Sequence, residues 1–168
     1  MKQLILLISF FTLLSTAEAQ KTKTAKTEIP LWKIHQLDSA IRNAEGPTIF
    51  NFWATFCAPC IAEIPYFQQL VKQYDTAGVK LILVSLDFKE NYPKKIADMA
   101  AKRKFTAPIT FVDESNADIL CPVVDKSWSG VLPATLFINP ENGYRAFYEE
   151  QMKKDAVEKE IKAMIKKS

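Results

Sequence analysis

The sequence predicts an α/β protein, a three-layer α/β/α sandwich built around a central mixed sheet. Short apolar runs suited to strands alternate with longer segments in which apolar residues recur every three or four positions. This alternation is typical of parallel strands joined by helical crossovers. The last two expected strands are separated only by Pro140–Gly143, whose Asn-Gly pair favours an antiparallel hairpin. Parallel crossovers followed by a hairpin give a sheet of mixed direction.

The N-terminal segment has the pattern of a secretory signal peptide. Lys2 supplies a basic start, an apolar run extends from Leu4 to Leu14, and Ala17-Glu18-Ala19 supplies the small residues of a cleavage site. The apolar run is shorter than the roughly 20 residues that a membrane-spanning helix needs. We therefore expect export to the bacterial periplasm, with an uncleaved membrane anchor as the less favoured alternative.

The rest of the chain is expected to form one domain. We divide the sequence into a signal peptide over 1–19, a flexible linker rich in Lys and Thr over 20–28, and a folded domain over 29–168. Roughly 150 residues remain after cleavage, which is enough to bury one core. The formal net charge of +3 is small and no array of basic and aromatic residues accompanies it, so nucleic-acid binding is not expected. We expect a monomer.

Strands and helices are expected to alternate in the first half of the domain. Leu31–His35 is a candidate edge strand, and Leu37–Ala44 has helical apolar spacing and ends before a Gly-Pro pair. Thr48–Trp53 is an apolar run with one polar residue, as expected for a buried strand. Ala58–Tyr74 has helical periodicity throughout, and Pro65 inside it should kink the helix.

The second half continues this alternation with one irregular stretch. The near-continuous apolar run Val79–Leu86 fits a strand buried on both faces of a parallel sheet. Asp113–Gly130 has no clear period, and we expect an irregular excursion there with one helical turn. The other expected strands are Ile109–Val112, Ala134–Ile138 and Tyr144–Glu149, and the other expected helices are Pro93–Lys104 and Lys153–Lys167.

A Cys-x-x-Cys pair, Cys57 and Cys60, follows the strand at 48–53 where a helix is expected to begin. Two thiols at this spacing can form a disulfide across the first helical turn, and a helix N-terminus favours the thiolate of the leading cysteine. This placement is typical of a redox-active dithiol. Half of a zinc site is the main rival, but only Cys121 and His35 remain as further Cys or His ligands. No metal and no other cofactor is expected.

Cys57 is the expected nucleophile, because its thiolate would attack a partner disulfide and form a mixed disulfide. Cys60, one turn into the helix, would resolve that intermediate; a purely structural disulfide is disfavoured because so small a loop gains little entropy. Glu63 lies three residues after Cys60. If partly buried, its carboxyl group would have a raised pKa and could exchange protons with the Cys60 thiol; an exposed helix glutamate is the alternative. Cys121 is expected to be a small buried apolar residue.

Three motifs occur in order along the domain. They are Asn51-Phe52-Trp53-Ala54-Thr55-Phe56-Cys57-Ala58-Pro59-Cys60, its continuation Ile61-Ala62-Glu63-Ile64-Pro65, and Gly130-Val131-Leu132-Pro133-Ala134-Thr135. Together they resemble the thioredoxin fold and, more narrowly, the TlpA/ResA group of exported thiol-disulfide oxidoreductases. The resemblance implies a thioredoxin-like sandwich over roughly 31–167. Two residues depart from it: Phe56 stands where the family usually has Trp, and Asn51 stands where cytosolic thioredoxins have a buried acid.

The resemblance also implies where a substrate binds. Pro133 would be cis and lie beside the cysteines, and the backbone of Leu132 would pair with an incoming peptide as an added strand. An ordinary proline at a strand entry is the alternative. Phe56 would form part of an apolar rim around the cysteines. Leu132, Pro133 and Phe56 are therefore the expected substrate-binding residues.

The leading interpretation is an exported thiol-disulfide oxidoreductase that reduces disulfides of specific partner proteins. Its partners would be a protein disulfide substrate and an upstream thiol electron donor, with membrane contact only through an uncleaved N-terminal segment. An enzyme that forms or isomerises disulfides on the same fold remains open, and the reduction potential distinguishes them, at about −120 mV for a strong oxidant and about −270 mV for a reductant. A copper-carrying module is disfavoured, since it needs Cys-x-x-x-Cys and a nearby histidine. A non-catalytic interaction domain is disfavoured because both cysteines are present.

Overall fold

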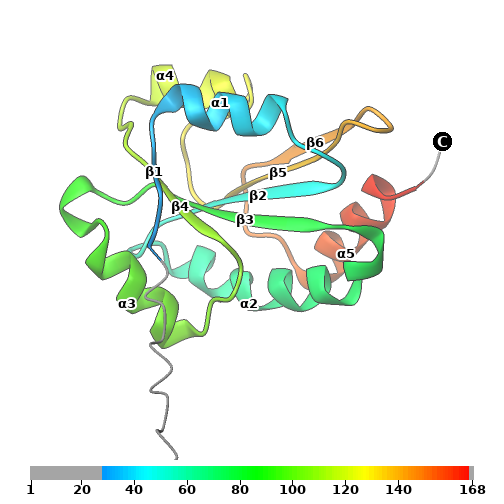
Figure 1. Cartoon of the computed structure of the whole chain (residues 1–168), viewed down its shortest axis with the longest axis horizontal. Helices are drawn as coiled ribbons and strands as arrows, with labels where there is room; N and C mark the ends of the chain where they lie inside the picture. Colours follow the sequence, from blue (N-terminus) through cyan, green and yellow to red (C-terminus); the bar gives the residue numbers. More distant parts are fainter. Residues whose placement is uncertain (1–27, 167–168) are drawn as a thin grey trace, which may run out of the picture.

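The computed structural model of the protein describes residues 28–166, so the expected signal peptide and nearly all of the expected linker lie outside the described residues. Six strands form one sheet in the order β1-β4-β3-β2-β5-β6. Helices cover both faces of this sheet (Figure 1). The predicted three-layer α/β/α sandwich with a mixed sheet is confirmed.

Strand β2 occupies the centre of the sheet. The strands are β1 (Leu31–Trp32), β2 (Thr48–Trp53), β3 (Lys80–Ser85), β4 (Ile109–Val112), β5 (Ala134–Asn139) and β6 (Tyr144–Tyr148). Strands β1, β4, β3 and β2 are parallel, whereas β5 runs antiparallel to β2 and β6 antiparallel to β5. Asn51 of β2 is in register with Leu83 on one side and Thr135 on the other. Every residue of β2 is buried.

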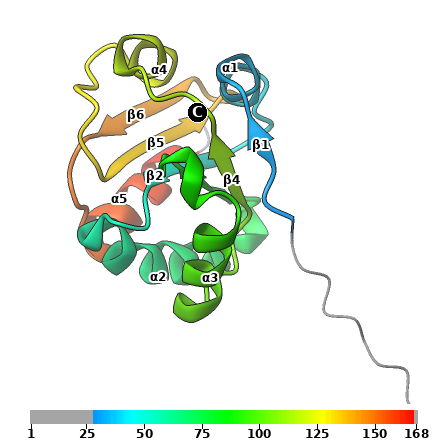
Figure 2. The same ribbon diagram turned by 90° about the vertical axis from the view of Figure 1, so that its left-hand side faces the viewer.

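The helices divide between the two faces of the sheet. They are α1 (Ile34–Arg42), α2 (Ala58–Gln73), α3 (Lys94–Arg103), α4 (Ala117–Val124) and α5 (Lys154–Met164). Figures 1 and 2 show α1 and α4 on one face and α2, α3 and α5 on the other. None of the helices within residues 28–166 has the length and apolar character needed to cross a membrane.

Alternation along β2 supplies both halves of the core. Successive side chains of a strand point to opposite faces of the sheet. Ile49 and Trp53 join the cluster that contains buried residues of α2 and α5, and Phe50 and Phe52 join the cluster that contains those of α1 and α4. The central strand is therefore covered on both sides, and its end is a fixed point from which the chain enters α2.

The start of the domain differs from the predicted elements. Strand β1 has only two residues, and α1 begins at Ile34, so His35 is helical and its placement in the first strand was wrong. The side chain of Gln36 accepts a hydrogen bond from the backbone N–H of Lys33 at 2.8 Å. This contact stabilises the helix start at a point where the sequence still looks like a strand.

A second difference concerns the stretch 113–130, where one helical turn was expected. The structure contains the eight-residue helix α4 there. Asn116 caps it by accepting the N–H of Asp118 at 2.9 Å, and a buried face made of Leu120, Cys121 and Val124 attaches it to the sheet. Pro122 lies inside the helix, which masks the helical pattern because proline usually ends a helix.

Replacing Phe50 with Ala is expected to lower the free energy of unfolding by about 3–5 kcal/mol, because the ring is fully buried at the centre of the sheet. Phe88→Ala is the matched control, since the Phe88 ring is 61% exposed and its loss should cost at most about 1 kcal/mol. Chemical denaturation of both variants measures the difference. Equal losses would show that Phe50 does not anchor the core.

Candidate active site

The Cys57–Cys60 pair lies at the N-terminus of α2, one turn after β2 ends. The N–H of Cys57 donates to the carbonyl of Ala54 at 3.0 Å and closes that turn. Cys57 is the N-cap residue of α2, and its Sγ accepts the N–H of Cys60 at 3.3 Å. The two cysteines form a disulfide with their Cα atoms 5.3 Å apart. A sulfur at this position receives both a helix N–H and the positive end of the helix dipole, which favour its thiolate form after reduction.

The two sulfurs differ in accessibility. Cys57 is 8% exposed, whereas Cys60 is fully buried. Cys57 also lines a groove on the surface, and Cys60 does not. A molecule in that groove can therefore reach the sulfur of Cys57 but not that of Cys60.

A buried carboxylate holds the turn that precedes Cys57. The two oxygens of Asp87, which is 7% exposed, accept the backbone N–H of Thr55 at 3.2 and 3.0 Å, and one of them accepts the Thr55 hydroxyl. Asp87 also accepts the hydroxyl of Ser85 at 2.9 Å and the side-chain amide of Asn91 at 3.1 Å. Sequence reasoning did not single out Asp87. Its position at the carboxyl end of the strand next to β2 was the available signal, because parallel strand ends gather at one edge.

Glu63 is a buried residue of α2, so the alternative of an exposed helix glutamate was wrong. Its side chain is fully buried, its Oε1 accepts the Asn51 side-chain amide at 2.8 Å, and its Oε2 accepts the N–H of Met152 at 3.0 Å. Burial raises the pKa of Glu63 to about 7, although both hydrogen bonds act in the opposite direction. Asn51 also donates to the hydroxyl of Thr135 at 3.0 Å. This network joins α2, β2, β5 and the segment before α5 behind the cysteines.

The Leu132–Pro133 peptide bond is cis, as the resemblance implied. Strand β5 begins at Ala134, which is in register with Phe52 near the end of β2. The segment before β5 therefore lies beside the turn that carries Cys57, and Leu132 lines the same groove. None of the hydrogen bonds found within residues 28–166 uses the N–H or the carbonyl of Leu132.

A surface carboxylate holds the loop in front of this cis bond. Glu149 accepts the N–H of Ser129 at 3.1 Å and that of Val131 at 2.8 Å, and it also accepts the Ser129 hydroxyl. These bonds, the one from the Ser129 side chain first, lower the pKa of Glu149. From the other side, the indole N–H of Trp128 donates to the carbonyl of Val131 at 3.0 Å. The loop is thus held through the backbone N–H groups of Ser129 and Val131 and through the backbone carbonyl of Val131.

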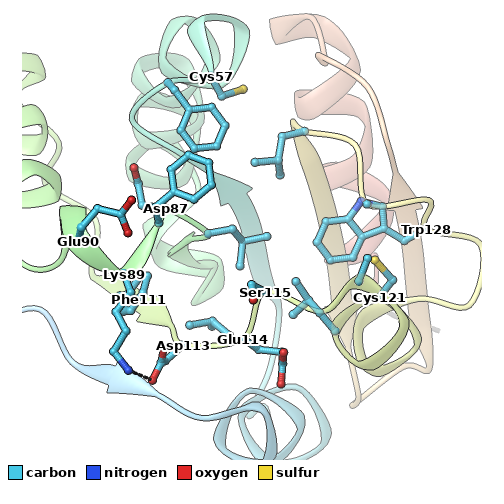
Figure 3. A pocket seen from close by; sticks show the side chains of 18 of the residues that line it. Cys57, Asp87, Lys89, Glu90, Phe111, Asp113, Glu114, Ser115, Cys121 and Trp128 are labelled. Atoms are coloured by element: carbon cyan, nitrogen blue, oxygen red, sulfur yellow. Dashed lines mark hydrogen bonds and ion pairs between the residues drawn. The ribbon is translucent and has the colours of Figure 1, made fainter.

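Cys57 opens onto a groove of about 920 Å³. Figure 3 shows Cys57 at one end, Trp128 and Cys121 along one side, and Glu114 toward the other end. Cys121 is a free thiol that is 5% exposed, and burial raises its pKa. The prediction of a small buried residue at Cys121 is confirmed.

An aromatic pair forms the rim of the groove beside Cys57. Phe56 is 57% exposed and stacks on Phe88, with ring centroids 5.2 Å apart. Both rings line the groove. Phe56 therefore lies where an apolar rim was expected, whereas Phe88 was not singled out from the sequence because a single aromatic residue after a strand carries no distinctive pattern.

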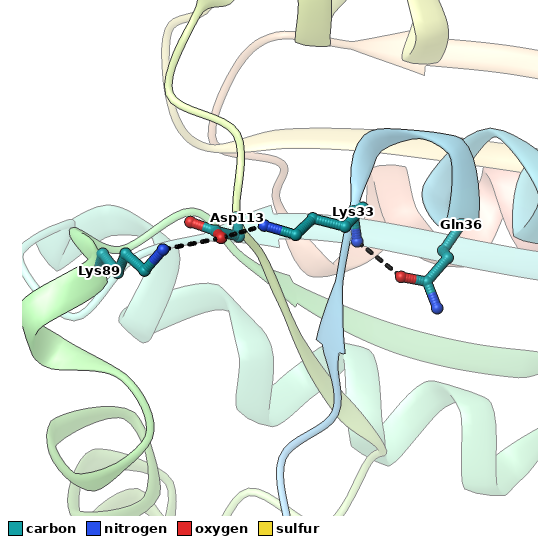
Figure 4. Close-up of polar contacts among 4 residues, drawn as sticks. All are labelled: Lys33, Gln36, Lys89 and Asp113. Carbon is teal, nitrogen blue, oxygen red and sulfur yellow. Dashed lines mark hydrogen bonds and ion pairs between the residues drawn. The ribbon is translucent and has the colours of Figure 1, made fainter.

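Ion pairs neutralise one carboxylate of the groove. Asp113 contacts the ammonium groups of Lys33 and Lys89, the latter at 3.1 Å (Figure 4). Hydrogen bonds from these two lysines lower the pKa of Asp113. Within residues 28–166, no three or more His, Cys, Asp or Glu side chains gather in a way that could hold a metal ion.

Comparison with known proteins identifies the family of the chain. A profile of the AhpC/TSA family matches residues 16–145, more than half of the chain. The chain belongs to the AhpC/TSA family. It is similar to the thiol-disulfide oxidoreductase ResA of Oceanobacillus iheyensis, with 31% identity over 127 residues that make up 75% of this chain and 62% of the relative. It is also similar to the sporulation thiol-disulfide oxidoreductase A of Bacillus subtilis, with 33% identity over 61% of this chain and 62% of the relative.

Solved structures show the same fold. StoA from Bacillus subtilis aligns with a TM-score of 0.56 at 24% identity, over 71% of this chain and 85% of that one. A thioredoxin-related protein from Neisseria meningitidis serogroup B aligns with a TM-score of 0.60 at 24% identity and the same coverage. The chain spans about three fifths of the length of the two curated relatives. The predicted thioredoxin-like fold and the resemblance to ResA-type proteins are confirmed.

Glu63→Gln is expected to flatten the pH dependence of stability between about pH 4.5 and pH 7. The folded-state pKa of about 7 lies above the ordinary value of 4.5, so the folded protein holds a proton that the unfolded chain has lost. The stability contributed by this proton is fully present below about pH 4.5 and is lost as the pH rises through about 7, a change on the order of 3 kcal/mol. Unfolding free energies of both proteins across this range measure it. Parallel pH curves would contradict the prediction.

Asp87→Asn is expected to lower the free energy of unfolding by about 1–3 kcal/mol. The new amide presents N–H groups where the Thr55 N–H and the Ser85 hydroxyl need acceptors. Asp113→Asn is the matched control, because its two lysine partners are largely exposed and such ion pairs contribute little. Thermal or chemical denaturation compares the two variants, and a loss in the Asp113 variant as large as that in the Asp87 variant would contradict a structural role for the buried carboxylate.

Proposed function

We propose that the protein is an exported thiol-disulfide oxidoreductase that reduces disulfides of specific partner proteins through Cys57 and Cys60. One observation carries the proposal: a disulfide at a helix N-terminus has one sulfur facing a groove and the other fully buried. A structural cross-link has no need of a groove or of this asymmetry. The relatives named as thiol-disulfide oxidoreductases support the same reaction class.

The reaction passes two electrons from the reduced dithiol to the partner. The Cys57 thiolate attacks one sulfur of the partner disulfide, the partner S–S bond breaks, and the released partner thiolate takes up a proton. Cys60 then loses its proton and attacks the Cys57 sulfur, which releases the second partner thiolate. The protein is left with the Cys57–Cys60 disulfide that the structure contains. An upstream thiol donor returns it to the dithiol form.

Glu63 is the proposed proton acceptor for the Cys60 thiol. It lies one helical turn beyond Cys60 on α2, and its pKa of about 7 allows it to gain or lose a proton near neutral pH. The neighbouring Asn51 donates a hydrogen bond and has no proton to relay. In cytosolic thioredoxins a buried acid transfers the proton. Here that role is assigned to Glu63, on the helix that carries the cysteines.

The partner peptide is proposed to bind across Leu132, Pro133 and Phe56. The backbone N–H and carbonyl of Leu132, which form no hydrogen bond within residues 28–166, suit an added strand, and Phe56 offers an exposed apolar surface beside Cys57. The signal-peptide pattern of residues 1–19 supports export to the periplasm, where a partner would carry disulfides. The protein is proposed to act there as a monomer and without a cofactor.

Cys60→Ala is expected to accumulate mixed disulfides with partner proteins, because Cys57 can still attack while the resolving thiol is missing. Cys57→Ala is the control and should trap nothing and lose all disulfide reductase activity. Non-reducing electrophoresis and mass spectrometry of the trapped species identify the partner. Trapping through Cys60 in the Cys57 variant would reverse the roles of the two cysteines.

The reduction potential of the wild-type pair decides the direction of the reaction. A value near −270 mV, measured against a glutathione or dithiothreitol couple, supports a reductant. A value near −120 mV would instead assign the protein to disulfide formation.

A further inference from the structure

The few large apolar side chains that are exposed within residues 28–166 include an aromatic pair beside Cys57. Within residues 28–166, four large apolar side chains are exposed: Phe56, Phe88, Ile119 and Val131. Two of them, Phe56 and Phe88, line the groove and stack on each other. Val131 lies between two groove-lining residues of the loop opposite, whereas Ile119 on α4 does not line the groove. Exposed aromatic surface next to a reactive group marks a contact site for a partner.

Hydrogen bonds between the residues that precede the two rings hold the aromatic pair in place. Phe56 follows Thr55 and Phe88 follows Asp87, and the Thr55 N–H and hydroxyl both donate to the Asp87 carboxylate. This buried contact keeps the two rings side by side. A preformed platform loses little conformational freedom when a partner side chain covers it.

The groove carries more negative than positive charge, because Asp87, Glu90, Asp113 and Glu114 line it together with the one cation Lys89. Asp87 is committed to its buried hydrogen bonds, and Asp113 is paired with two lysines. Glu90 and Glu114 line the groove and form no ion pair within residues 28–166. The only hydrogen bond that Glu114 accepts there comes from the N–H of Asn116 at 2.9 Å. These two carboxylates therefore favour a basic side chain in the occupant.

We propose that this groove is the docking surface for an extended, cystine-bearing segment of the partner protein. An apolar side chain next to the partner cysteine packs on the platform formed by Phe56 and Phe88, and a Lys or Arg side chain farther along the segment is attracted by the carboxylates of Glu90 and Glu114. The inference rests on the proposed function and adds the substrate class. Phe88, Glu90 and Glu114 become residues that select the partner.

Defined peptides test the proposal. Each synthetic peptide carries one cysteine as a mixed disulfide with glutathione, and the reduced protein releases the glutathione. The reference peptide has Phe beside the cysteine and Arg farther along, and two matched peptides replace Phe with Ala or Arg with Glu. Glutathione disulfide itself is the substrate without flanking residues. The readout is the ratio of each peptide's second-order rate constant to that of glutathione disulfide.

Phe88→Ala is expected to lower this ratio about 10-fold for the reference peptide, since burial of an aromatic ring is worth at least that factor. The ratio for the peptide with Ala in place of Phe should change little. Phe88→Leu should retain most of the effect, and Ile119→Ala, which removes an exposed apolar side chain outside the groove, should leave the ratio unchanged. Equal decreases of the ratio for the Phe and Ala peptides in the Phe88→Ala variant would overturn the proposed contact with the aromatic platform.

The role of the two carboxylates is tested with the double variant Glu90→Gln/Glu114→Gln. The control is the single variant Glu141→Gln, which removes a carboxylate in the β5–β6 turn. Wild-type protein should prefer the Arg peptide over the Glu peptide at low salt, and added salt should weaken that preference. The double variant should lose it and the control should keep it. Equal preference in wild type and the double variant would overturn the proposed role of Glu90 and Glu114 in selecting the partner.

Three further outcomes separate the possible failures. Wild-type protein that reduces glutathione disulfide but shows no preference among the peptides would overturn the docking surface and leave the proposed function standing. Protein that reduces none of these disulfides would overturn the proposed function itself. A concentration-dependent dimer in sedimentation, abolished by Phe88→Ala, would assign the platform to a second copy of the chain and overturn the proposal.

Discussion

The burial of strand β2 on both faces and both edges is the constraint on which the rest of the structure depends. Its backbone pairs with β3 and β5, and its side chains fill both halves of the core. A shift of the strand by one residue would move Phe50 and Phe52 to the opposite face of the sheet. Its end at Trp53 is therefore fixed, and so is the turn that makes Cys57 the cap of α2. A buried central strand thus sets the position of a reactive sulfur at the edge of the sheet.

Three carboxylates extend this rigidity to the parts of the site that the strand does not reach. Asp87 holds the turn before Cys57, Glu149 holds the loop before the cis bond, and Glu63 joins the helix to the sheet behind the cysteines. The surroundings of Glu149 and Glu63 differ, and so do the pKa values of their carboxyl groups. Glu149, bonded by backbone and hydroxyl donors at the surface, stays ionised, whereas Glu63 is poised near neutral pH because it is buried. One residue type therefore serves as an anchor in one place and as a titrating group in another.

Local pattern predicted most of the fold but not the polar contacts of the site. Strands β2 and β4 begin and end at the predicted residues because apolar runs bounded by turn residues define them. The helix α4 was largely missed because Pro122 reads as a helix breaker, and His35 was misplaced because a two-residue strand leaves no period. The contact between Asp87 and Thr55 spans 32 positions of the sequence. It depends on which strands lie side by side, which no local pattern contains.

The unequal burial of the two sulfurs has a kinetic consequence. In the proposed cycle the partner is joined covalently to Cys57, and only attack by Cys60 within the same molecule releases it. Cys60 is fully buried, so the partner never contacts the atom that ends its attachment. If Glu63 accepts the Cys60 proton as proposed, the lifetime of the covalent complex depends on the interior of the protein, through the protonation of Glu63, and not on how tightly the surface holds the partner. Docking and release can therefore vary independently, so that a tightly docked partner need not be a slowly released one.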